Sequence, residues 1–217
     1  MTNVTREVQR FLDHDVAIRK DLGRQLINKR ALAMHIQKQL GLRDGTDAII
    51  SAVRRYETEL KEEDTFAKAR AIIKNAKIST RTGIAIVALV KDADVQEMLP
   101  KLFTLIHYAR GETIRLIQAE ETIKVIVDGK NVGKVTDLFG KKSVVKVEQN
   151  LAELNMRLGE VSAKVPGVLA ILHTELANNS VNIVETCSCV PEVLWFLDQK
   201  DLLKAHHTFL EFIESLN

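Results

Sequence analysis

The chain has 217 residues, of which 46% are apolar and 28% are charged, so it can bury a hydrophobic core and is not intrinsically disordered. Three prolines and ten glycines exclude collagen-like and low-complexity architectures, and a net charge of +2 imposes no particular partner. The sequence lacks both an apolar run of about 18 residues and a signal-peptide pattern at its start. Its two cysteines are too few for a disulfide framework, and together these features predict a cytoplasmic protein.

The first 60 residues read as helices with little alternation of β-branched residues. One helical segment ends near Gly23, a second spans 28–40, and a third spans 46–60. The second begins with an asparagine, a typical cap, and is followed by Gly41, which can end a helix. Three helices joined by a tight turn predict a helix-turn-helix core.

The segment 77–90 combines a basic start with an apolar run, and Gly83 separates the two parts. Because glycine relieves the backbone of a tight turn, we interpret this segment as a β-hairpin. Its basic tip, Lys77–Arg81, would then form the wing of a winged-helix-like domain that covers residues 1–82.

Basic side chains of this domain could contact the phosphates of double-stranded DNA. Residues 1–60 carry eleven Lys and Arg against eight Asp and Glu, and the third helix of such a fold enters the major groove. The candidate nucleic-acid-binding residues are Arg24, Lys29, Arg30, Ser51, Arg54, Arg55, Lys77 and Arg81. Acidic residues surround the third helix, so a solvated charged face and a protein-docking or dimerisation role both stay open.

From Ile84 the chain is expected to repeat the order strand, helix, strand, strand, helix, strand. The first round covers 83–147 and the second 148–217. The expected strands are 84–90, 113–118, 122–127, 144–147, 152–158, 181–188 and 193–197, and the expected helices are 94–108, 132–138, 167–177 and 201–215. This order is typical of ferredoxin-like units, so the sequence predicts an α+β protein with a helical domain followed by two such units.

The most informative motif lies where the first strand of the second round turns into its helix. It reads Val165-Pro166-Gly167-Val168, and Asn182-Ile183 follow after the helix and a loop of small residues. Gly167 lets a ligand approach the backbone closely, and Pro166 fixes the direction in which the chain enters the helix. The free N–H groups at the helix start suit a carboxylate, and the Asn182 amide offers both a donor and an acceptor.

Residues 154–210 resemble the ACT domain, in the version found at the regulatory end of aspartate kinases. The resemblance implies an amino-acid effector that lies between the loop and the Asn-Ile strand, often across a subunit or domain interface. The implied ligand-binding residues are Val165, Pro166, Gly167, Val168, Asn182 and Ile183. The first round matches only in the order of its elements, because its loop at 90–94 lacks Pro-Gly. The alternative is that Pro166-Gly167 is only a turn before a helix.

Catalysis and metal binding are not expected. Cys187 and Cys189 lie on one side of a predicted strand, but a second cysteine pair is lacking, so we expect no metal and no cofactor. We therefore expect a regulatory protein rather than an enzyme. Its partners would be an amino-acid effector, double-stranded DNA and a second copy in a homodimer, with no membrane. This interpretation is a transcriptional regulator of amino-acid metabolism. The alternative is a regulatory or scaffolding subunit that docks on a biosynthetic enzyme.

Overall fold

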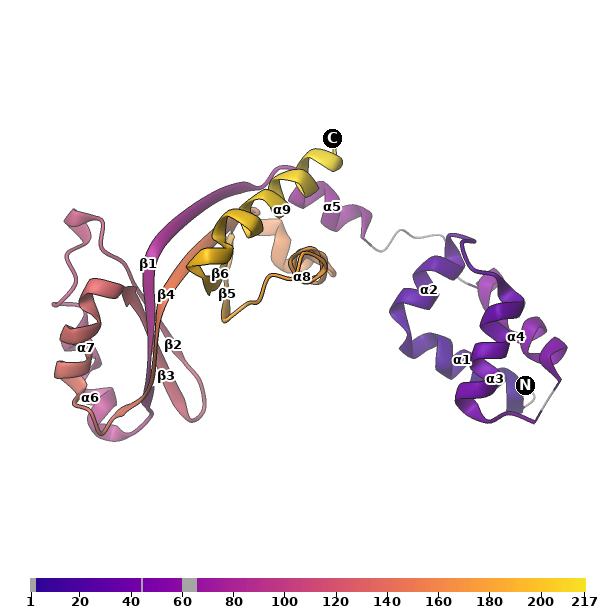
Figure 1. Ribbon diagram of the computed structural model, residues 1–217, viewed down its shortest axis with the longest axis horizontal. Coiled ribbons are helices and arrows are strands. Elements are labelled where there is room, and N and C mark those ends of the chain that lie inside the picture. The colour runs from indigo at the N-terminus through magenta and orange to yellow at the C-terminus, as the bar shows by residue number, and fades with distance from the viewer. Residues whose placement is uncertain (1–2, 44, 60–65) are drawn as a thin grey trace. The chain divides into compact units, whose positions relative to one another are not determined.

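The computed structural model describes residues 3–43, 45–59 and 66–217 (Figure 1). The chain forms two compact units, which divide between residues 64 and 65. Unit 1 is helical, and unit 2 combines helices with one six-stranded antiparallel sheet. The predicted α+β class is therefore confirmed.

The described residues of unit 1 form four helices. They are α1 (Asn3–His14), α2 (Val16–Gly23), α3 (Lys29–Leu40) and α4 (Thr46–Glu59). The first predicted segment is two helices because Asp15 starts a new one, its Oδ1 accepting a hydrogen bond from the N–H of Ile18 at 2.9 Å. The helices enclose a core of Val8, Leu12, Leu22, Leu32, Ala33, Ile36, Ile49, Ala52, Val53 and Tyr56.

The predicted limits of α3 are confirmed by its caps. The Asn28 Oδ1 accepts hydrogen bonds from the N–H groups of Arg30 and Ala31 at 3.0 and 3.1 Å. Gly41 ends the helix in the left-handed conformation, with φ of 61°. Among the described residues of unit 1 there is no strand, so this unit has the expected helices without a wing.

Unit 2 contains α5 to α9 and β1 to β6. The helices are α5 (Ala67–Ile73), α6 (Ala93–Leu102), α7 (Val132–Phe139), α8 (Val168–Asn178) and α9 (Leu202–Ser215). The strands are β1 (Lys77–Val90), β2 (Ile114–Gln118), β3 (Thr122–Asp128), β4 (Val144–Arg157), β5 (Glu185–Cys189) and β6 (Glu192–Asp198). Their order in the sheet is β2-β3-β1-β4-β6-β5.

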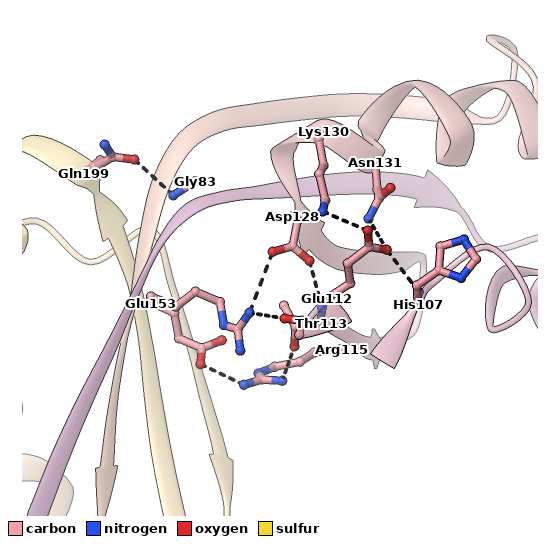
Figure 2. A network of polar contacts seen from close by, with 12 residues as sticks. Gly83, His107, Glu112, Thr113, Arg115, Asp128, Lys130, Asn131, Glu153 and Gln199 are labelled. Carbon is pink, nitrogen blue, oxygen red and sulfur yellow. Dashed lines mark hydrogen bonds and ion pairs between the residues drawn. The ribbon is translucent and has the colours of Figure 1, made fainter. Parts of the chain in front are cut away.

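The predicted hairpin at Gly83 is wrong, because Lys77–Val90 is one long strand. Its first half pairs with the end of β4, from Lys77 opposite Arg157 to Arg81 opposite Glu153. Gly83 lies at an irregularity in this pairing rather than in a turn, with φ of 69°. Its N–H donates to the Oε1 of Gln199 at 3.1 Å (Figure 2).

β1 and β4 each serve both ferredoxin-like halves of the sheet. The first half has the order β2-β3-β1-β4, and the second has β5-β6-β4-β1, with the start of β1 as its last strand. The domain limits expected at 82/83 and 147/148 therefore fall inside β1 and β4. The wing residues Lys77–Arg81 belong to this sheet because β4 offers them a partner strand.

Two groups of helices cover one face of the sheet. The sheet bends, so that side chains on the other face of its two halves pack against each other. α6 and α7 cover a core that contains Val87 and Val125, and α5, α8 and α9 cover one that contains Leu154 and Trp195. A third core joins β1, β3, β4 and β6 through Ile84, Ile86, Ile126, Leu151, Leu194 and Phe196. β1 and β4 curve strongly through this region (Figure 1).

A polar network surrounds the end of β3 (Figure 2). The Glu112 carboxylate accepts hydrogen bonds from Lys130 Nζ at 2.8 Å, from the N–H of His107 at 3.0 Å and from Asn131 Nδ2 at 3.1 Å. These donors, above all Lys130, lower the pKa of Glu112 from 4.5 to about 2. The carboxylate thus joins the loop before β2 to the turn after β3.

We expect acid to weaken unit 2 through Glu112. Because its folded pKa is depressed, its contribution is complete above pH 4.5 and is lost as the pH falls toward 2. The variant Glu112→Gln should be less stable at pH 7 and should lose less stability between pH 4.5 and 2. Urea unfolding followed by Trp195 fluorescence measures both. Equal pH dependence in the two proteins would contradict this assignment.

Candidate ligand-binding site at the start of helix α8

The turn into α8 depends on a glycine. Gly167 has φ of 90° and ψ of −9°, a left-handed conformation that L side chains rarely adopt. Its C=O accepts the first hydrogen bond of the helix, from the N–H of Ile171 at 3.0 Å. The N–H groups of residues 168–170 precede that bond and have no intrahelical acceptor, and Gly167 has no side chain to cap them. These donors suit an anionic group.

A pocket of about 340 Å³ lies at this turn. It is formed by the end of β4, the 3₁₀ turn Glu160–Lys164, the first turn of α8 and the loop between β5 and β6. Its lining residues are Leu158, Ser162, Ala163, Val165, Gly167, Val168, Leu169, Ala170, Ser188, Val190 and Val193. The volume is at the lower end of the range for small-molecule sites.

Three of the six predicted ligand-binding residues line this pocket. They are Val165, Gly167 and Val168, whereas Pro166 is exposed beside it. The sequence did not indicate the contributions of Ser188, Val190 and Val193. These residues reach the pocket because β5 and β4 run in the same direction. Both strands therefore end on the same side of the sheet.

Asn182 and Ile183 lie away from the pocket within one chain. Cys189 at the end of β5 and Arg157 at the end of β4 both pair with Glu192 at the start of β6. These three strand ends therefore lie together, beside the pocket. Asn182 and Ile183 precede the opposite end of β5. Asn182 is exposed, and Ile183 packs against the core under α8 and α9.

Phe66 packs directly against Gly167. A Cβ atom at residue 167 would lie 2.3 Å from both Cδ1 and Cε1 of the Phe66 ring, closer than atoms can approach. α5 follows Phe66, and its residues Ala69 and Ile73 share a core with Leu172 of α8. Gly167 therefore has two structural roles. It adopts the left-handed conformation that precedes α8, and its lack of a side chain leaves room for the Phe66 ring.

The predicted nucleic-acid residues are divided between the two units. Arg24, Arg30, Ser51, Arg54 and Arg55 are exposed in unit 1. Lys29, also in unit 1, forms an ion pair with Glu57 at 2.5 Å and ties α3 to α4.

The predicted wing is wrong, because its residues lie in β1 of unit 2. Lys77 is exposed there, and Arg81 donates to the backbone oxygen of Gly111 at 2.7 Å and faces Asp128 at 3.8 Å. Arg81 therefore contributes to the polar network rather than to a free basic tip.

Other classes of site find no support in the part of the chain that the structure describes. It contains no group of three or more His, Cys, Asp or Glu that could hold a metal ion. None of its helices has the length and apolar character needed to cross a membrane. Burial raises the pKa of the Cys187 thiol, which favours the uncharged form.

No protein-family model matches the sequence, and no curated protein matches it. Solved structures do resemble it. The aspartate kinase of Clostridium acetobutylicum matches 63% of this chain with a TM-score of 0.51 and 18% identity. The regulatory subunit of aspartate kinase from Thermus thermophilus matches 62% with a TM-score of 0.50 and 11% identity. The matched part of the chain, 62–63% of its length, shares the fold of aspartate kinase regulatory domains.

The extent of the similarity differs between these two structures. The alignment covers 34% of the Clostridium enzyme but 95% of the Thermus regulatory subunit. At this level of identity the comparison shows the fold alone. That fold agrees with the resemblance carried by Val165–Val168.

Proposed function

We propose that this protein is a non-catalytic regulatory subunit that binds an amino acid at the pocket beside Gly167 and docks on a biosynthetic enzyme. The observation that carries the proposal is the pocket itself. Its glycine turn leaves the first N–H groups of α8 without intrahelical acceptors, in a fold shared with aspartate kinase regulatory domains. A carboxylate fits those donors, and the hydroxyls of Ser162 and Ser188 can accept from an ammonium group.

A homodimer is part of this proposal. The resemblance implies that the effector lies across an interface and also contacts Asn182 and Ile183. Because these residues lie at the other end of β5 in one chain, they can reach the pocket only from a second copy. β5 is at the edge of the sheet, and no other described strand pairs with its outer side, which suits pairing of this kind.

Docking on an enzyme accounts for the structure better than binding DNA does. The described residues of the helical unit form no wing, Lys29 is engaged with Glu57, and Arg81 is engaged with Gly111. The exposed Arg30, Arg54 and Arg55 keep double-stranded DNA as a second candidate partner. A salt-dependent shift of random duplex DNA that weakens in Arg54→Ala/Arg55→Ala would favour that candidate.

A thermal-shift screen of the twenty amino acids tests the proposed function. At least one should raise the Tm of the full chain, because a ligand that prefers the native state stabilises it. In calorimetry Asn182→Ala should weaken that ligand by about tenfold, corresponding to one lost hydrogen bond. Asn178→Ala, an exposed asparagine at the end of α8, is the matched control and should bind normally. A chain that responds to none of the amino acids would contradict the proposal.

A further inference from the structure

Among the residues that the structure describes, those that line the pocket beside Gly167 carry no charged side chain. Its eleven lining residues are aliphatic, alanine, glycine or serine. The charged residues Arg157, Glu160, Lys164 and Glu192 are close to lining residues in the sequence but do not line the pocket. From this lining, and on the basis of the function proposed above, we infer that the effector is an amino acid with an apolar aliphatic or thioether side chain.

The floor of the pocket excludes a charged ligand side chain. Val168 and Val193 are 3% and 4% exposed and are fixed in the core under α8 and α9. Their side chains offer no opposite charge. An ammonium or carboxylate placed against them would lose its hydration without gaining a partner, which is strongly unfavourable.

The rim of the pocket favours an apolar side chain for a second reason. Leu169 and Val190 line the pocket and remain 38% and 40% exposed. An aliphatic side chain in the pocket would remove part of this apolar surface from water. An aspartate side chain would not gain from that contact, and a lysine side chain would gain only through its methylene groups.

The polar groups that one chain contributes to the pocket are few. The N–H groups of residues 168–170 lie at one end. The Ser162 Oγ already donates to the oxygen of Gly159 at 2.7 Å, so it can only accept from a ligand ammonium. Ser188 supplies the other hydroxyl. The ligand ammonium uses these two acceptors, and Asn182 of the second copy adds to them in the proposed homodimer. A hydroxyl such as that of threonine would compete with the zwitterion for the same few groups.

Calorimetry on the full chain tests this inference with L-leucine, L-isoleucine, L-valine and L-methionine against L-lysine, L-aspartate and L-threonine. At least one of the first four should bind about tenfold or more tightly than each of the other three. Equal or tighter binding of lysine, aspartate or threonine would overturn the inference while leaving the proposed function intact. Binding of no amino acid would overturn both.

A pair of variants locates the binding. Ala170→Glu places a carboxylate at the exposed rim of the pocket, where it occupies space and repels the ligand carboxylate, so leucine affinity should fall by about tenfold or more. Ala177→Glu makes the same change at an exposed position at the far end of α8 and should leave affinity within about twofold. Equal affinities in the two variants would overturn the assignment to this pocket. Trp195 fluorescence confirms that both variants are folded.

Discussion

Gly167→Ala is expected to destabilise unit 2 by about 2–5 kcal/mol. The cost has two parts: the left-handed backbone at φ of 90°, worth about 1–2 kcal/mol, and the collision of the new Cβ with the Phe66 ring. Urea unfolding followed by Trp195 fluorescence measures it. Trp195 is the one tryptophan of the chain and lies in the core beneath α8.

The two parts can be separated by removing the ring. In a Phe66→Ala background the collision disappears, so Gly167→Ala should cost only about 1–2 kcal/mol there. The same cost in both backgrounds would show that Phe66 does not require a glycine at 167. Because this substitution also displaces Phe66, Ala170→Glu is the cleaner probe of ligand binding.

Arg115→Met is expected to destabilise unit 2 by about 3–5 kcal/mol. The Nη2 of Arg115 donates to the Oε1 of Glu153 at 2.7 Å (Figure 2), and Glu153 is 4% exposed. Within the described residues, the Oε2 of Glu153 has no hydrogen-bond partner. Without the guanidinium, a buried carboxylate loses its cation next to the core that joins the two bent halves of the sheet.

Replacing both members of the pair should restore most of the lost stability. Arg115→Met/Glu153→Leu extends the apolar core between the sheet halves and leaves no unpaired charge, so it should be markedly more stable than Arg115→Met. Lys146→Met is the control, since Lys146 pairs with Glu148 on the surface and should cost less than about 1 kcal/mol. Equal losses of unfolding free energy in Arg115→Met and Lys146→Met would contradict this account of the buried pair.

The parts of the fold that local chemistry determines could be predicted from the sequence. Asn28 and Gly41 mark the ends of α3, and the alternation of strands and helices in unit 2 follows the apolar pattern. Gly83 misled the prediction because a glycine with positive φ serves a hairpin turn and a strand irregularity equally well. The choice depends on β4, about seventy residues later, which pairs with Lys77–Arg81.

The same limit applies to the candidate site. Val165, Gly167 and Val168 are adjacent in the sequence, so one motif indicated all three. Val190 and Val193 join them only through the order of the strands, which no local pattern encodes. The contact between Phe66 and Gly167 joins residues a hundred positions apart and left no signal in the sequence.

A crystal structure of the full chain grown with L-leucine tests the central claim most directly. We expect the amino acid in the pocket, with its carboxylate at the N–H groups of residues 168–170 and its side chain against Val168 and Val193. A pocket filled instead by protein side chains, with leucine absent or bound elsewhere, would contradict the account.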